Sequence, residues 1–132
     1  MLDDRAAGRC LGSTHMDDQG YARARWVGDL CLLSGLVASP RHLDGDLTAQ
    51  AGDVFAQAEV LLGEQGLGLS DVVSVTGYLI NPENFGPYDL VWRATFPTDA
   101  PVRTTVASGL LVPGALIELA VTAARTAPHD AR

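Results

Sequence analysis

The chain has 132 residues, of which 47% are hydrophobic and 19% are charged, as in a single globular domain rather than a disordered chain. Its net charge of −7 argues against a nucleic-acid partner, because phosphate contacts need clustered lysine or arginine. All nine basic residues are arginine, so chemistry that forms a Schiff base on a lysine amine is excluded.

The sequence lacks the patterns of metal, cofactor and membrane binding. His15, His42 and His129 lie far apart, and Cys10 and Cys31 do not have the C-x-x-C spacing of a metal site. Cys31 lies in an apolar run, which favours a buried thiol. Neither a phosphate-binding loop nor a dinucleotide motif occurs, so we expect no metal and no cofactor. With no apolar run long enough for a membrane span and no secretory signal, we expect a cytoplasmic protein.

The first predicted elements form a hairpin. Residues 21–26 alternate between apolar and polar, as in a half-exposed strand. Gly28-Asp29 supplies a tight turn into the apolar run 30–34. We therefore expect two antiparallel strands here.

An amphipathic helix is expected next. Apolar side chains recur at positions 54, 58, 61 and 62, which is the spacing of one helix face. Asp46 or Thr48 can cap this helix, and Gly66 can end it. Residues 72–80 are rich in β-branched and aromatic side chains and predict a third strand.

The second half of the chain predicts one more helix and two more strands. Residues 82–85 are expected to form a single turn, and the helix is expected over 88–96 with Pro87 in its first turn. Strands are expected at 103–107 and 115–123. The resulting order, ββαβαββ, indicates an α+β fold with a mixed sheet and both helices on one face.

This layout has consequences for assembly and for the ends of the chain. The sheet face without helices needs cover, and a partner subunit is the economical answer. Residues 1–132 are expected to form one domain with a core over about 20–125. Residues 1–18 and 126–132 are expected to be poorly ordered tails.

Glu118 is the most informative residue. It lies inside the apolar strand 115–123 and shares a face with Leu116 and Ala120, where an isolated charge is costly. Arg103 opens the preceding strand, and a loop of moderate length would pair the two strands antiparallel. The pair is either a salt bridge that only joins the strands or part of a site.

The residues around this pair resemble the reactive-intermediate deaminase family, called Rid or YjgF. The block 101–106 (PVRTTV), followed by Glu118 in LIEL, resembles the C-terminal signature of that family. The segment 26–35 (WVGDLCLLSG) resembles its first hairpin, with Tyr21 thirteen residues before Ser34. The segment 66–73 (GLGLSDVV) resembles its passage from helix to strand, and together the motifs span residues 21–125.

The resemblance implies a chorismate-mutase-like homotrimer with active sites in the clefts between subunits. It also implies an enzyme that hydrolyses reactive enamine or imine acids, such as 2-aminoacrylate, to 2-keto acids and ammonia without a cofactor. Arg103 would grip the substrate carboxylate, and Glu118 would orient water and move its proton. The implied substrate-binding residues are Tyr21, Ser34, Gly35, Leu36, Asp89 and Thr105.

Three of these residues depart from the family pattern. Thr105 stands where cysteine is common, Leu36 stands where glutamine is common, and Asp89 stands where asparagine is frequent. We therefore expect a substrate that is bulkier or less acidic than aminoacrylate. A cyclisation or lyase step in the same cleft, a non-enzymatic binding role, and the ribonuclease and chaperone roles sometimes attached to the family remain alternatives.

Overall fold

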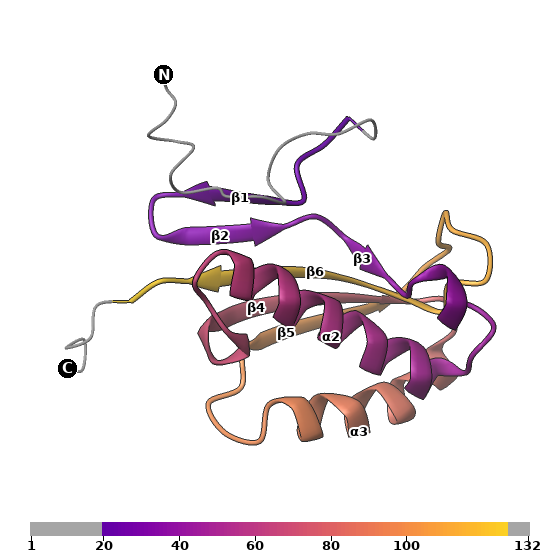
Figure 1. Ribbon diagram of the computed structural model, residues 1–132. Coiled ribbons are helices and arrows are strands. Elements are labelled where there is room, and N and C mark those ends of the chain that lie inside the picture. Colours follow the sequence, from indigo (N-terminus) through magenta and orange to yellow (C-terminus); the bar gives the residue numbers. More distant parts are fainter. Residues whose placement is uncertain (1–19, 127–132) are drawn as a thin grey trace.

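The chain folds as a six-stranded sheet with two helices against one face (Figure 1). The computed structural model describes residues 20–126. The strands are β1 (Ala24–Val27), β2 (Leu30–Leu33), β3 (Leu36–Val37), β4 (Val72–Leu79), β5 (Val102–Ala107) and β6 (Ile117–Ala124). The helices are α2 (Leu47–Glu64) and α3 (Phe85–Thr95), and the short 3-10 helices are η2 (Pro40–His42), η3 (Leu69–Asp71) and η4 (Pro82–Asn84).

The sheet is mixed, as the sequence predicts. Its order is β1-β2-β6-β4-β5, and the short strand β3 also pairs with β6. Strands β4 and β5 are parallel, and helix α3 supplies the crossover that a parallel pair needs. All other pairs are antiparallel. The predicted α+β class with both helices on one face is therefore confirmed.

The expected pairing of the last two strands is wrong. Strand β4 lies between β5 and β6 and pairs with both of them. The physical reason is the α3 crossover, which returns the chain to the outer edge of β4 and leaves the inner edge for β6. The segment between β5 and β6 therefore crosses the end of β4 instead of forming a hairpin.

Helix α2 follows the sequence pattern closely. Asp46 caps it by accepting a hydrogen bond from the Ala49 N–H at 2.9 Å, and Gly66 follows its end with a positive φ of 80°. Helix α3 begins at Phe85, three residues earlier than predicted. The turn η4 runs directly into it, and Pro87 lies in its first turn as expected, where its missing N–H costs nothing.

The core lies between the helices and the sheet. Phe55 of α2 packs against three rings associated with α3, with centroid distances of 6.5 Å to Tyr88, 6.3 Å to Trp92 and 5.6 Å to Phe96. Alternate residues of β6 face this layer and are almost fully buried: Ile117, Leu119, Val121 and Ala123. Cys31 is also buried, as predicted.

A single buried glutamine ties two loops to α2. The Gln50 side chain is fully buried, and its Nε2 donates to the carbonyls of Leu43, Gly45 and Gly114 at 3.0–3.2 Å. Its Oε1 accepts a hydrogen bond from the Leu116 N–H at 2.9 Å. Because buried amides are costly when unpaired, this complete set of partners makes Gln50 a strong structural constraint.

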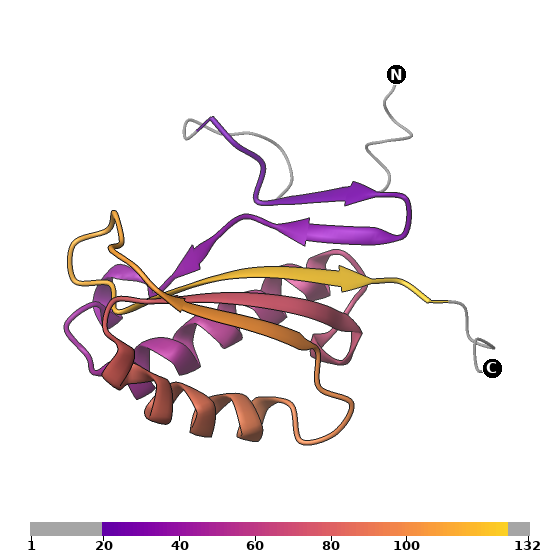
Figure 2. The ribbon, with the colours of Figure 1, turned by 180° about the vertical axis from the view of Figure 1, so that it is seen from behind.

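The second sheet face carries no helix (Figure 2). Several large apolar side chains of β1, β2 and β5 are exposed: Val27 (61%), Leu30 (42%), Leu32 (41%), Val102 (70%) and Val106 (42%). Glu118 also lies on this face, because it alternates with the buried residues of β6. We call this side of the sheet the open face.

The expected tails and the expected absence of a membrane span can be compared with the structure only over residues 20–126. Of the tails expected at 1–18 and 126–132, only Thr126 falls within the described residues. Neither described helix is long and apolar enough to cross a membrane.

Candidate active site

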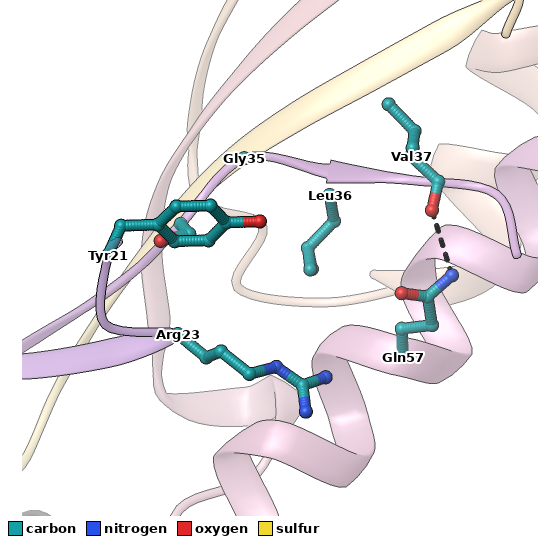
Figure 3. Close-up of a pocket in the computed structure, with 7 residues that line it drawn as sticks. Tyr21, Arg23, Gly35, Leu36, Val37 and Gln57 are labelled. Carbon is teal, nitrogen blue, oxygen red and sulfur yellow. Dashed lines mark hydrogen bonds between the residues drawn. The ribbon is translucent and has the colours of Figure 1, made fainter. Parts of the chain in front are cut away.

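Four of the predicted site residues line one pocket. Tyr21, Ser34, Gly35 and Leu36 surround a pocket of about 370 Å³ next to the hairpin. Figure 3 shows the Tyr21 ring beside Gly35, while the Arg23 side chain extends toward α2. Arg23, Val37 and Gln57 form the remaining walls of this pocket, which we call the hairpin pocket.

Glu118 reaches the wall of the hairpin pocket at Gly35. A Cβ at Gly35 would overlap Glu118 Oε2 and lie 3.2 Å from its Cδ. The carboxylate therefore lies directly against the Gly35 backbone, which only a glycine permits. Strand pairing fixes this approach, because Leu36 lies opposite Leu119 and Val37 lies opposite Glu118.

Arg103 lies on the other side of the sheet, among aromatic rings. Its guanidinium carbon is 4.9 Å from the Trp92 ring centroid, 5.2 Å from Phe85 and 6.0 Å from Tyr88. Such contacts with ring faces favour a cation. Its Nη1 donates to Asp89 Oδ1 at 2.8 Å, and its side chain remains 25% exposed. We call this group the arginine site.

Asp89 is held between two arginines. Its Oδ2 accepts a hydrogen bond from Arg93 Nε at 2.8 Å, while its Oδ1 accepts from Arg103. The hydrogen bonds from Arg93 and then from Arg103 lower the pKa of the Asp89 carboxyl below its ordinary value. The same contact raises the pKa of Arg93. Asp89 is therefore a carboxylate at neutral pH, and the three groups together carry one net positive charge.

Thr105 borders a second, smaller pocket near Arg103. Leu79, Phe85 and Thr105 are among the residues that line this space of about 240 Å³. Two buried hydroxyls in this region, Thr105 Oγ1 and Tyr88 Oη, have no hydrogen-bond partner within the described part of the chain. Burial raises the pKa of Tyr88 to about 12, so this phenol stays protonated.

Arg103 and Glu118 do not meet within one chain. Glu118 pairs with Tyr78, and Tyr78 pairs with Val106, three residues beyond Arg103. Strand spacings of about 4.8 Å and a rise of about 3.3 Å per residue place the two Cα atoms about 14 Å apart. Their side chains also point to opposite sheet faces. The expected contact between the two side chains is therefore wrong for a single chain, and each belongs to a separate group of predicted residues.

The sequence reasoning missed several residues in these two groups. Arg23 and Gln57 line the hairpin pocket, and Phe85 and Trp92 hold Arg103. The alternation of 21–26 does place Arg23 on the same side as Tyr21, which is a signal that could have found it. Gln57 lies on α2, and its position depends on tertiary contacts that no local pattern shows.

A polar cluster beside the hairpin pocket has a structural role. Asp53 accepts hydrogen bonds from the Ser39 N–H and from Gln57 Nε2, both at 2.8 Å, and its Oδ1 lies 3.3 Å from His42 Nδ1. Burial raises the pKa of Asp53, but these hydrogen bonds and the charge of His42 outweigh it and lower the pKa overall. Ser39 Oγ and Asp53 Oδ1 both contact Nδ1 of His42. A nucleophilic triad needs the hydroxyl and the carboxylate on different ring nitrogens, so these three residues lack its geometry.

Metal ligands do not gather within residues 20–126. No group of three or more histidine, cysteine, aspartate or glutamate side chains there could hold a metal ion. The two groups offer a guanidinium, two carboxylates and the hydroxyls of Tyr21 and Ser34.

Comparison with known proteins identifies the family. The model of the family described as Endoribonuclease L-PSP matches residues 16–125. The RutC family protein YoaB of Escherichia coli is 31% identical over 107 residues, which cover 78% of this chain and 93% of that protein. The chain belongs to the YjgF/RutC/Rid family. Another relative, the 3-aminoacrylate deaminase RutC of Acinetobacter baylyi, is 29% identical, and the match covers 76% of this chain and 82% of that protein.

Solved structures of family members have the same fold. A YjgF family protein from Mycobacterium tuberculosis is 30% identical with a TM-score of 0.73, and the match covers 80% of this chain and 86% of that one. A YjgF family protein from Neisseria meningitidis is 26% identical with a TM-score of 0.77, covering 85% and 92%. The predicted family and its chorismate-mutase-like fold are thus confirmed, and the homotrimer stays a prediction.

Proposed function

We propose that the protein hydrolyses enamine or imine acids to 2-keto acids and ammonia, at a site assembled between copies of the chain. The observation that carries this proposal is the arginine site, where a partly exposed guanidinium lies between aromatic rings. Among the described residues, Asp89 is the only hydrogen-bond acceptor for Arg103. Most of its five N–H donors therefore remain for a substrate carboxylate.

The reaction needs a carboxylate clamp and a group that handles a proton. Arg103 binds the substrate carboxylate, and Glu118 accepts a proton from water as the water oxygen bonds to the imine carbon. The electron pair of the C=N bond moves to nitrogen, and Glu118 returns the proton there, which gives a tetrahedral amino alcohol. Glu118 then moves the hydroxyl proton to nitrogen. The C=O bond forms as the C–N bond breaks, and a keto acid and ammonia result. The Gly35 backbone and Tyr21 supply the wall beside Glu118.

Two copies are needed to bring these groups together. In one chain Arg103 and Glu118 lie on opposite faces of the sheet, with β4 between their strands. The exposed apolar side chains of the open face favour association, because burying Val27, Leu30 and Leu32 removes apolar surface from water. We propose a homotrimer in which the hairpin pocket and Glu118 of one copy face the arginine site of the next.

Charge favours deamination over RNA cleavage. The family description names an endoribonuclease, whereas one relative is named a 3-aminoacrylate deaminase. This chain has 16 acidic and nine basic residues, so its net charge of −7 opposes the approach of a polyanion. A small imine acid carries one carboxylate, which a single guanidinium can bind.

Ammonia release tests the proposed reaction. Imine acids are generated in situ by an amino-acid oxidase over a panel of amino acids, and ammonia release is measured with and without the protein. Arg103→Ala should lower kcat/KM by tenfold or more, because about 1.5–3 kcal/mol of charged hydrogen bonding is lost. Arg103→Lys should not restore it fully, since an ammonium lacks the planar fork. Glu118→Gln should lower kcat by about 10²–10⁴ while keto-acid binding persists.

Mixing the two inactive variants tests the assembly between copies. If each site takes Arg103 from one copy and Glu118 from another, refolded mixtures of Arg103→Ala and Glu118→Gln chains contain some intact sites. In an equal mixture, the copy that supplies Arg103 is intact there in half of the sites, and the copy that supplies Glu118 is intact there in half. Random assembly should therefore restore about a quarter of wild-type activity. A mixture as inactive as its components would refute the shared site. Wild-type rates in both single variants would refute the assignment of both residues.

A further inference from the structure

The arginine site contains a carboxylate where a substrate carboxylate is expected to bind. Asp89 Oδ1 lies 2.8 Å from Arg103 Nη1, and the Asp89 side chain is 20% exposed. A monoanion that approaches Arg103 therefore also approaches a negative charge. The contact with Arg93 returns one positive charge to the group, but the Arg93 side chain is 73% exposed and so is well screened by solvent.

Asp89 keeps the capacity to bind a positively charged ligand group. A carboxylate has about four lone-pair sites, and the two arginines use one on each oxygen. Two adjacent groups of opposite charge, Arg103 and Asp89, are thus both partly exposed to a ligand. The rings of Phe85 and Trp92 flank the guanidinium and lower the local polarity.

We propose that Asp89 is a specificity-determining residue, which makes the arginine site select ligands that carry a positively charged nitrogen next to their carboxylate. This inference rests on the proposed function for its substrate, which is then the protonated iminium form of an imino acid. In such a molecule the carbon that carries the nitrogen is bonded directly to the carboxylate carbon. The carboxylate can therefore contact Arg103 while the positive nitrogen contacts Asp89. The iminium form is also the better electrophile, because its positively charged nitrogen accepts the C=N electron pair and becomes a neutral amine.

A purely positioning role for Asp89 makes a different prediction. Asn at this position keeps an oxygen that can accept from Arg103 Nη1 but removes the negative charge. If Asp89 only orients Arg103, Asp89→Asn weakens all carboxylate ligands equally or leaves them unchanged. If Asp89 selects by charge, the variant changes the order of preference between ligands of the same shape.

Two unreactive probes with one carbon skeleton separate these readings. Binding of 2-aminobutanoate, a zwitterion, and 2-oxobutanoate, a monoanion, is measured by calorimetry on the wild type and on Asp89→Asn. We expect the wild type to prefer the zwitterion, and the variant to shift the ratio of the two dissociation constants by at least about tenfold toward the monoanion. Glu59→Gln, an equal charge change at an exposed position of α2, should leave the ratio unchanged.

An unchanged ratio in Asp89→Asn overturns the inference, and so does failure of the wild type to bind either probe at 10 mM, which is roughly the weak limit of specific binding. The outcome is separable from that of the proposed function. A shifted ratio without any ammonia release refutes the deaminase proposal and leaves the charge selection standing. Ammonia release with an unchanged ratio supports the deaminase proposal and refutes the charge selection by Asp89.

Discussion

Replacing Gly35 by alanine tests whether the position of Glu118 matters for function. The new Cβ would overlap Glu118 Oε2 and lie 3.2 Å from Cδ, so the carboxylate must withdraw by about 1 Å. A displacement of that size at a proton-transferring group costs about 10²-fold in rate. Gly35 does not have a positive φ, so alanine fits its backbone, and the free energy of unfolding should change by less than about 1 kcal/mol.

Ammonia release and thermal denaturation are measured together on Gly35→Ala. The control is Gly52→Ala in α2, where nothing lies within 4 Å of the added Cβ. The control should keep wild-type activity and gain stability of about 0.5–1 kcal/mol, because alanine favours a helix. Wild-type turnover in Gly35→Ala would show that the contact between Gly35 and Glu118 is not part of the catalytic geometry.

Four further predictions concern stability and binding. Gln50→Leu should lower the free energy of unfolding by about 3 kcal/mol, because the partly buried Leu116 N–H and three carbonyls lose their hydrogen-bond partner. A loss below about 1 kcal/mol in urea denaturation would contradict this. Tyr88→Phe should be neutral or stabilise by about 1 kcal/mol, because it removes a buried hydroxyl that has no hydrogen-bond partner among residues 20–126. A clear drop in Tm would refute that reasoning. The pKa of Asp53 is lower in the folded chain than its unfolded value near 3.8. The stability that the Asp53 carboxylate adds is therefore complete above the unfolded pKa and is lost as the pH falls through the folded pKa. Asp53→Asn should flatten the acid limb of a plot of Tm against pH. A mobility-shift titration should detect no RNA complex at micromolar protein, and a salt-dependent complex would show that the net charge of −7 is a poor guide here.

Local patterns predicted most of the elements, because their causes are local. The spacing of apolar residues in α2, its Asp46 cap and the β-branched run of β4 all depend on neighbours within a few residues. The predicted start of α3 is three residues late, because the sequence pattern separates the turn at 82–85 from the helix, whereas the turn η4 continues directly into it. Strand β3 has only two residues and leaves no periodic signal.

The sequence could not show which predicted site residues meet. A crossover sets the order of β5, β4 and β6, whereas the predicted contact between Arg103 and Glu118 depends on consecutive strands pairing with each other. The real neighbour of Arg103 is Asp89, on a helix, which the sequence suggested only as a pocket residue. Four residues of the hairpin pocket, Tyr21, Ser34, Gly35 and Leu36, were implied by the resemblance to the family, and the hairpin pairs the strands next to which they lie.

The choice of an amide at Gln50 affects how the chain responds to its solution. This side chain joins the loop at Leu43 and the strand entrance at Leu116, two residues before Glu118. A glutamine does not ionise, and its neutral hydrogen bonds are not screened by dissolved ions. The backbone that carries Glu118 is therefore anchored independently of acidity and ionic strength. This anchor should then hold at acidities where Asp53, on the other side of the hairpin pocket, has lost its charge-dependent contacts.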